Sequence, residues 1–219
     1  MSRSNEFWKF FDTEAGPRLA HRERTFRRIF EHLDLIEGHI TIVETGCARL
    51  ADNWEGDGQS TVIFDKYITC RDGTSSCHSV DINPTSVAEC RKLVSQRVEV
   101  SQDDSVHYLS LLSRRFLKES KIVDFLYLDS FDLDMTYWYP SAIHHLKELL
   151  AVIRCLDAKT LVVVDDCPLN GSFIPSDGNQ ISFVAKPSVG GKGRLVAEYA
   201  EAVGATLVFA EYQAGWTGF

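Results

Sequence analysis

Four short apolar segments of this chain each end in or beside an acidic residue, and this recurrence constrains the fold more than any other feature. The segments are residues 40–46 (I-T-I-V-E-T-G), 78–83, 123–129 and 161–166, and the last ends in two adjacent carboxylates. In an open parallel sheet every strand delivers its C-terminal end to the same edge, so these acids should converge on one crevice where ligands bind. The pattern predicts an enzyme that holds a ribose-bearing cofactor and a metal.

Segments with helical periodicity alternate with these apolar runs, which is typical of βαβ units. We therefore predict an α/β fold with a Rossmann-like, doubly wound, mostly parallel sheet of about seven strands and helices on both faces. A chain of 219 residues with 44% hydrophobic content can bury one substantial core, so a single domain over residues 1–219 is expected. Within it, residues 1–38 should form an N-terminal helical extension and residues 39–219 the cofactor-binding core, with residues 206–212 closing the sheet.

Charge and hydropathy exclude several classes of partner. A formal net charge of −8 argues against nucleic acid, because phosphate binding needs a positive surface. No apolar run reaches the roughly 18 residues of a membrane span, and residues 1–12 are too polar and aromatic for a secretory signal. We expect a cytoplasmic protein without a membrane partner. The phenylalanine-rich N-terminus predicts either packing within the chain or the contact of a homodimer.

The turns after the first two strands carry the candidate cofactor residues. Ser60 is well placed to cap a helix whose positive end faces the crevice. Asp81 follows the first glycine at about the distance expected for an acid that takes ribose hydroxyls. It could instead cap the next helix, but Asn83 or Thr85 can fill that role before Pro84 and leave Asp81 free.

This order of motifs resembles the class I S-adenosylmethionine-dependent methyltransferases. The resemblance covers most of the chain from residue 40 onward, and it implies S-adenosyl-L-methionine as cofactor. Residues 43–46 are similar to the first motif of that family, and Asp81 matches the acid that binds both ribose hydroxyls. Asp129 falls at the substrate edge of the fourth strand. The implied cofactor-binding residues are Glu44, Thr45, Gly46, Ser60, Asp81, Asp104 and Ser105, the last two beside the adenine ring.

Within that family, the acids after strands four and five are similar to those of metal-dependent O-methyltransferases of the catechol and macrolide-sugar types. The resemblance implies that Asp129, Asp165 and Asp166 hold Mg²⁺, a hard cation that prefers oxygen ligands. A metal would also relieve the repulsion among three carboxylates and lower the pKa of a bound hydroxyl. The alternative is that Asp165 or Asp166 caps a loop while Asp129 is catalytic alone.

The proton acceptor is less defined than the cofactor site. The catechol-type enzymes carry a lysine shortly after the strand-four aspartate, whereas here the next lysine is Lys147. Asp132, His144 or His145 would then accept the proton, or the metal would make a strong base unnecessary. The family's further glycines are also missing after Gly46. A metal-independent methyltransferase that uses an aspartate as base, and an inactive cofactor-binding assembly subunit, therefore stay open; a nicotinamide oxidoreductase is disfavoured by the lack of G-x-G-x-x-G.

The acceptor should be a small hydroxylated molecule such as a sugar or a natural-product intermediate. Its pocket would be built from the N-terminal helices, the aromatic residues 137–139 and the loop 168–191. Gly171, Pro175 and residues 177–179 in that loop suggest a lid over the site. The basic residues of segment 18–28 form a solvated helix face or hold an anionic group of the substrate.

Overall fold

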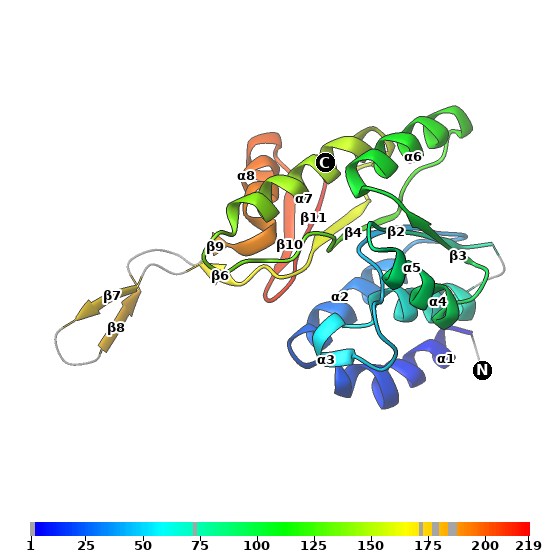
Figure 1. Ribbon diagram of the computed structural model, residues 1–219, viewed down its shortest axis with the longest axis horizontal. Coiled ribbons are helices and arrows are strands. Elements are labelled where there is room, and N and C mark those ends of the chain that lie inside the picture. The colour runs from blue at the N-terminus through cyan, green and yellow to red at the C-terminus, as the bar shows by residue number, and fades with distance from the viewer. Residues whose placement is uncertain (1–2, 72–73, 171–172, 177–179, 184–187) are drawn as a thin grey trace.

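The fold is built around one twisted sheet. The computed structural model describes residues 3–71, 74–170, 173–176, 180–183 and 188–219, and within them a seven-stranded sheet has the order β10-β11-β5-β4-β1-β2-β3 (Figure 1). Its strands are β1 (Thr41–Thr45), β2 (Ser76–Asp81), β3 (Val98–Gln102), β4 (Phe125–Leu128), β5 (Leu161–Val164), β10 (Thr206–Ala210) and β11 (Ala214–Thr217). The pairs of β1 with β2, β1 with β4, β2 with β3 and β4 with β5 are all parallel. The predicted mostly parallel sheet is confirmed.

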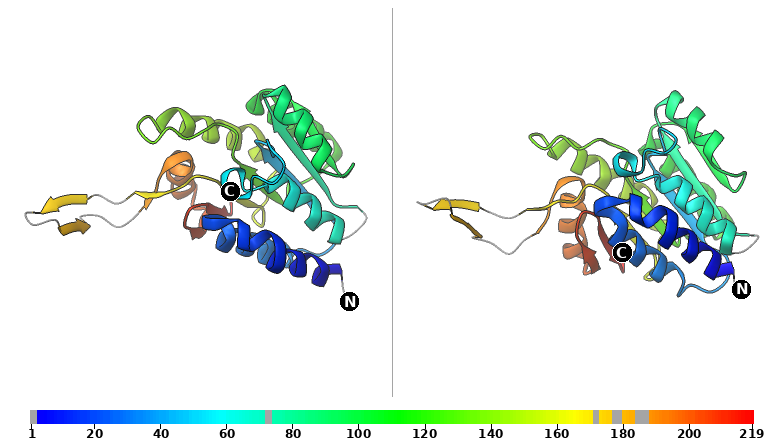
Figure 2. Two further views of the ribbon diagram at one scale, coloured as in Figure 1. Left: turned by 60° about the horizontal axis from the view of Figure 1, so that its bottom comes forward. Right: turned by 90° about the horizontal axis from the view of Figure 1, so that it is seen from below.

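Helices cover both faces of the sheet, as predicted (Figure 2). One face carries α1 (Arg3–Phe10), α2 (Glu23–Leu33), α4 (Ser60–Arg71) and α5 (Pro84–Leu93). The other carries α6 (Ser105–Glu119), α7 (Tyr139–Val152) and α8 (Arg194–Val203). Short turns of π-helix (Phe11–Ala15) and 3₁₀-helix (Gly16–Arg18 and Ala20–Arg22) join α1 to α2, and α3 (Trp54–Asp57) lies in the long loop after β1.

The strand sequences explain this two-sided burial. Successive residues of a strand point to opposite faces, so a strand covered on both sides must be apolar throughout. In β5, Val163 belongs to the core cluster that contains residues of α1, α2 and α4, while Val162 and Val164 belong to the cluster of the other face. All four residues of β5 are buried. The central strands therefore read as continuous apolar runs.

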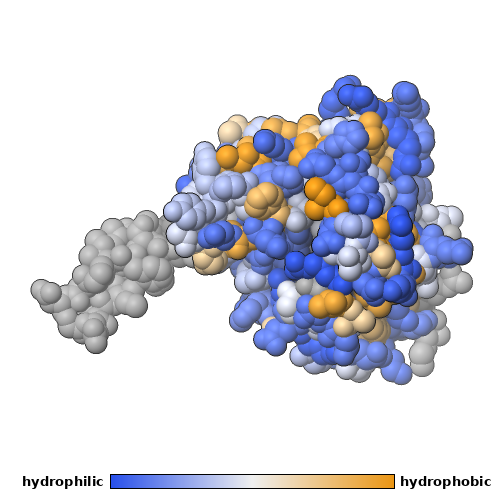
Figure 3. All heavy atoms as spheres, viewed as in Figure 1, coloured by the Kyte–Doolittle hydropathy of each residue, from blue (hydrophilic) through white to orange (hydrophobic). Residues whose placement is uncertain are grey.

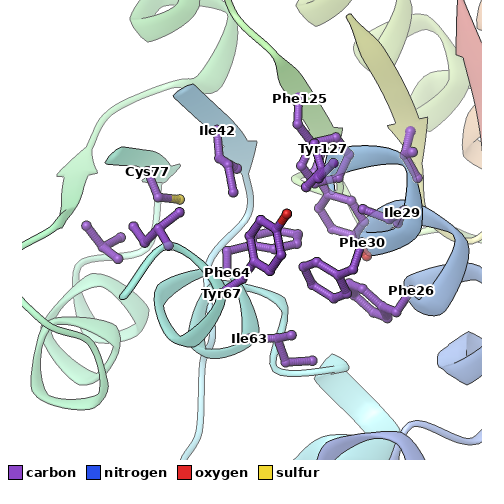
Figure 4. Close-up of a cluster of buried hydrophobic side chains, with 14 of the residues drawn as sticks. Phe26, Ile29, Phe30, Ile42, Ile63, Phe64, Tyr67, Cys77, Phe125 and Tyr127 are labelled. Atoms are coloured by element: carbon purple, nitrogen blue, oxygen red, sulfur yellow. The ribbon is translucent and has the colours of Figure 1, made fainter. Parts of the chain in front are cut away.

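The N-terminal aromatics form the core on the first face (Figure 4). Phe7 packs edge to face on Phe30 with ring centroids 4.5 Å apart, and Phe26 stacks on Tyr127 of β4 at 5.9 Å. Phe64 of α4 joins them. These rings are buried within one chain, which is the packing role predicted for them.

The C-terminal edge differs from the prediction. Residues 206–212 were expected to close the sheet, and β10 does lie at its edge, but β11 runs antiparallel between β5 and β10. Its sequence A-G-W-T is short and contains a glycine, so local pattern does not mark it as a strand. The glycine is needed because a Cβ on Gly215 would lie 2.7 Å from the ring of Phe209.

The long segment after β5 forms two small antiparallel pairs. β6 (Leu169–Asn170) pairs with β9 (Ser188–Val189), and β7 (Phe173–Ser176) pairs with β8 (Gln180–Phe183). The β7–β8 pair lies apart from the main sheet at the left of Figure 1. Gly171 and residues 177–179, on which the lid prediction rests, are outside the described residues.

The surface is mixed in character. On the face in Figure 3, hydrophobic residues are scattered among hydrophilic ones. Among the described residues, none of the helices is both long and apolar enough to cross a membrane.

Candidate active site

The site lies where the direction of strand addition reverses. β1 is flanked by β2 on one side and β4 on the other, and chain connections leave this point in opposite directions, which opens a crevice at the C-terminal strand ends. Two adjoining hollows occupy it and share Asp81 and Ser130. The first is lined by Gly46, Cys47, Arg49, Ser60, Asp81, Asp129, Ser130 and Asp132. The second has a volume of about 300 Å³ and is lined by Asp81, Ile82, Asp104, Ser105, Ser130, Phe131 and His144.

Gly46 makes the close approach of β1 to β4 possible. Its φ is +80°, in the left-handed region that favours glycine, and a Cβ there would lie 2.5 Å from the carbonyl oxygen of Asp129. Its N–H donates to the carbonyl of Val80 at 2.8 Å, which ties the turn to β2. The structure thus places Gly46 where the sequence motif predicted, between the two strand ends that form the hollow.

Asp81 lines both hollows and organises the turns around them. Its Oδ2 accepts the backbone N–H of Cys47 at 3.3 Å, and its Oδ1 accepts that of Asn83 at 2.7 Å. Asn83 caps α5, since its side chain accepts the N–H groups of Thr85 and Ser86 at 2.8 and 3.4 Å. Asp81 is therefore not the cap of α5, and its carboxylate stays at the cleft.

Glu44 lies under the cleft rather than on its wall. It is fully buried and accepts hydrogen bonds from the hydroxyls of Ser60 (2.6 Å), Thr61 (2.7 Å) and Ser79 (2.6 Å). Burial raises the pKa of Glu44 to about 7, and the three hydroxyl donors only partly oppose this. Ser60 is the first residue of α4, and its hydroxyl serves Glu44, so the predicted capping role of that side chain is wrong.

A buried polar network supports the second hollow. Glu148 of α7 accepts Ser130 Oγ at 2.5 Å and Thr45 Oγ1 at 3.2 Å, and its Oε1 lies 3.4 Å from His144 Nε2. His144 Nε2 is also 2.8 Å from Ser105 Oγ. Burial acts to raise the pKa of Glu148, but hydrogen bonds and the nearby histidines outweigh it and lower that pKa. Thr45 is thereby placed beneath the cleft.

The remaining predicted residues divide between the two hollows. Asp104 caps α6 by accepting the N–H of His107 at 2.9 Å, and it lines the second hollow with Ser105 and His144. Asp132 lines the first, is largely exposed and lies 3.4 Å from Arg49. His145 is fully buried, and burial lowers its pKa to about 4. Its Nδ1 contacts the carbonyl of Ser141 at 2.7 Å, a place within the helix packing.

The three predicted metal ligands do converge, but around two basic side chains. The ammonium of Lys192 donates to Asp129 and lies 3.0 Å from Asp166 Oδ2. The guanidinium of Arg22 lies 2.8 Å from Asp165 Oδ2 and 3.4 Å from Asp166 Oδ1. Burial favours the neutral form of both bases, but the carboxylates outweigh it and raise the pKa of Lys192 and of Arg22. Both therefore stay charged.

This arrangement does not fit Mg²⁺. Magnesium needs several free oxygen ligands, whereas Asp129 and Asp166 are taken by Lys192, and Asp166 also accepts the hydroxyl of Tyr212 at 2.5 Å. One carboxylate oxygen would be available to a metal, because Asp165 Oδ1 is buried without a hydrogen bond among the described residues. A single oxygen of a fully buried carboxylate does not make an octahedral site. Within those residues no group of acids, histidines or cysteines is arranged to hold a metal.

Lys192, Arg22 and Glu148 were not identified from the sequence. Lys192 had one available signal, because it stands between glycines in G-G-K-G, a pattern that allows the backbone to approach a neighbouring segment closely. Arg22 belongs to a basic segment whose other members are mostly exposed, so its burial carries no local signal. Glu148 occupies a buried position of α7, and a buried acid needs partners. The aromatic residues 137–139, predicted for the acceptor pocket, include Tyr137 and Tyr139, which are exposed.

Comparison with known proteins gives a likeness in structure only. No family model matches the chain, and no curated protein matches it in sequence. Among solved structures, an O-methyltransferase from Bacillus cereus in complex with SAH superimposes with a TM-score of 0.50 and 14% identity, over 99% of this chain and 91% of that one. MycE methyltransferase of the mycinamycin biosynthetic pathway, in complex with Mg and SAH, gives a TM-score of 0.53 and 13% identity. That match covers 92% of this chain, which spans about half of the MycE chain (54%).

At 13–14% identity these superpositions bear on the fold alone. The resemblance predicted from the sequence is confirmed at the level of the fold. The chain has the fold of the class I S-adenosylmethionine-dependent methyltransferases.

Proposed function

We propose that the protein is an S-adenosylmethionine-dependent methyltransferase that methylates an oxygen of a small hydroxylated molecule, such as a sugar or a natural-product intermediate. The observation that carries the proposal is the position of Asp81. It stands at the end of β2 and lines both hollows, so it would lie beside a ribose that joins the methionine and adenine parts of the cofactor.

The two hollows suit the two ends of that cofactor. The first lies against the turn at Gly46, where backbone rather than side chain forms the wall and an amino acid moiety can approach closely. The second is flanked by Ile82 and Phe131, which can pack on an adenine ring, and by the polar side chains of Asp104 and Ser105. Glu44 and Thr45 act from below, by holding the strand ends in place.

Methyl transfer needs an acceptor oxygen that has lost its proton. The oxygen attacks the sulfonium methyl carbon, the carbon–sulfur bond breaks, and its electron pair stays on sulfur, which leaves SAH. We assign Asp129 as the acceptor of this proton, because it lines the first hollow directly after β4. Its backbone N–H donates to the carbonyl and to the hydroxyl of Thr45, which fixes its position. Asp132 is the second candidate, but its exposure and its pairing with Arg49 favour it less.

Without the two basic side chains, the carboxylates of Asp129, Asp165 and Asp166 would suggest a magnesium-assisted reaction. Lys192 and Arg22 carry the positive charge at Asp129, Asp165 and Asp166, so the proposed reaction contains no metal step.

The test is calorimetric titration of the purified protein with SAH. Asp81→Asn should weaken binding by about 10- to 100-fold, which corresponds to one or two lost hydrogen bonds to a charged group. Glu89→Gln is the matched control, because it also replaces a carboxylate by an amide, on the exposed side of α5 where Glu89 pairs with Lys92 at 2.6 Å. That variant should bind SAH like the wild type.

Two outcomes would redirect the proposal. No SAH binding by the wild type would leave only a shared fold. SAH binding without methyl transfer to any of a panel of hydroxylated acceptors would favour a cofactor-binding assembly subunit. In an active enzyme, Asp129→Asn should lower kcat while SAH affinity stays within about threefold of the wild type, because the residue acts on the acceptor.

A further inference from the structure

Two basic side chains occupy the centre of the acidic cluster at the ends of β4 and β5. The side chains of Lys192 and Arg22 are only 2% and 7% exposed, so their charges are held among Asp129, Asp165 and Asp166 and away from solvent. Lys192 bridges Asp129 and Asp166, and Arg22 bridges Asp165 and Asp166. Each carboxylate therefore has a basic partner, and the one in the middle has two.

The backbone is shaped to deliver Lys192 to this place. Gly191 has a φ of +52°, and a Cβ on it would lie 2.2 Å from the carbonyl oxygen of Asp166. A Cβ on Gly193 would lie 2.4 Å from the sulfur of Cys167. The N–H of Lys192 donates to that same carbonyl of Asp166 at 3.1 Å. The G-G-K-G turn thus lies directly against the end of β5, and side chains on either side of Lys192 would prevent this.

The ammonium and a divalent cation exclude each other here. Lys192 contacts Asp129 Oδ1 and Asp166 Oδ2, so a metal bound to these two carboxylates would lie a few ångströms from a buried positive charge. At about 4 Å, even two unit charges repel by about 4 kcal/mol in a medium of intermediate polarity. A bound metal would have to displace Lys192, whose backbone is fixed on both sides.

We infer that Lys192, supported by Arg22, is a built-in replacement for a divalent metal at the ends of β4 and β5, and that the protein neutralises its acidic cluster without Mg²⁺. Lys192 holds the carboxylate of Asp129 in place, so it is a positioning residue for the proposed proton acceptor. Only this consequence for catalysis rests on the proposed function. Neutralisation of the acidic cluster by Lys192 and Arg22 can be tested without any activity.

The first experiment is a titration of chelator-treated, full-length protein with Mn²⁺, followed by the electron paramagnetic resonance signal of the free ion. The wild type should leave Mn²⁺ free at concentrations up to about 1 mM, since the oxygen ligands are taken. Lys192→Met keeps the length of the side chain and removes its charge. It should bind one Mn²⁺ at least about tenfold more tightly than the wild type, because the repulsion is gone and two carboxylates are released.

Three further proteins make the result specific. Lys118→Met removes a charge from the exposed end of α6 and should behave like the wild type. Lys192→Arg keeps the charge and should also leave Mn²⁺ free. Lys192→Met combined with Asp129→Asn should lose the gained site. Circular dichroism of each variant shows whether it is folded, and the wild-type and Lys192→Arg titrations keep the test decisive if Lys192→Met does not fold.

Two results would overturn the inference. One is binding of a single Mn²⁺ or Mg²⁺ by the wild type below about 1 mM, with loss of that binding in Asp129→Asn. The other is a folded Lys192→Met protein that gains no metal. SAH titration of the same samples keeps the two proposals separate, because a wild type that binds SAH but no metal supports both. A wild type that binds neither leaves the cation inference standing and removes the methyltransferase.

Discussion

At the scale of single residues, buried acidic side chains of this protein are paired either with neutral hydroxyl groups or with basic side chains. Glu44 is the case without a base. Its fully buried carboxyl is surrounded by Ser60, Thr61 and Ser79, and its pKa rises from 4.5 to about 7. The folded protein therefore holds a proton here at pH values at which the unfolded chain has released it.

Glu44 should make stability depend on pH in a defined direction. Between pH 4.5 and 7 the folded state binds more protons than the unfolded state, so the free energy of unfolding falls as pH rises through this window. Glu44→Gln lacks the titration. Its free energy of unfolding minus that of the wild type should increase by about 3 kcal/mol between pH 5 and pH 8, measured by urea denaturation. A difference that is constant across this range would contradict the raised pKa.

At the scale of elements, the turn Gly191–Gly193 decides where Lys192 lies. Gly193 has an ordinary backbone, with φ of −83°, so its requirement for glycine is steric. A Cβ would meet Cys167 Sγ at 2.4 Å and Val189 Cγ1 at 3.0 Å. Gly38 offers the opposite case, since its φ is +80° and nothing lies within 4 Å of a built Cβ.

Gly193→Ala should destabilise the protein by about 2–3 kcal/mol through overpacking. Gly38→Ala should cost about 1–2 kcal/mol through backbone strain alone. Cys167→Ala opens space for the new methyl group, so Gly193→Ala and Cys167→Ala together should cost clearly less than the sum of the two single changes. Gly38→Ala and Cys167→Ala should simply add. Urea unfolding of the variants measures these couplings, and additive costs for Gly193 and Cys167 would exclude the steric account.

At the scale of the whole molecule, buried polar contacts fasten the N-terminal helical layer to the sheet. Arg22 reaches Asp165, 143 residues away, at 2.8 Å. Three residues further on, the hydroxyl of Thr25 lies 2.5 Å from Gln213 Oε1, and the amide of Gln213 donates to Tyr127 of β4 at 2.7 Å. The same segment thus joins the helical layer, the two C-terminal strands and the acidic cluster.

Breaking the Arg22–Asp165 contact should be far more damaging than breaking a surface pair of the same segment. Arg22→Met leaves a fully buried carboxylate without its base and should cost about 3–5 kcal/mol of unfolding free energy. Arg24→Met removes a pair with Glu211 in which the arginine is 79% exposed, and it should cost less than about 1 kcal/mol.

Combining Arg22→Met with Asp165→Asn should recover part of the loss, because the buried charge is removed with its partner. Chemical denaturation gives the free energy of unfolding of the wild type and of these three variants. Equal costs for the Arg22 and Arg24 variants would show that the buried pair does not hold the layer in place.

The sequence determined the framework because the framework depends on local pattern. Apolar runs as short as β5 can only be strands covered on both faces, and parallel strands bring Gly46, Asp81, Asp129 and Asp165 to one edge whatever the loops do. The cap at Asn83 depends on neighbouring residues in the same way. β11 was not predicted from the sequence, because its pairing with β5 and β10 makes it a strand and the local sequence A-G-W-T does not.

Tertiary structure alone decided what neutralises the acids. From the sequence, three converging carboxylates would repel one another, and a metal was the cation that the resemblance suggested for them. Lys192 and Arg22 lie 63 and 143 residues from their partners Asp129 and Asp165, so no local pattern could pair them. The fold brings the G-G-K-G turn and the N-terminal segment to the same strand ends. Because the cost of burying a charge depends on which opposite charges lie within a few ångströms, it is set by three-dimensional contact and not by position along the chain.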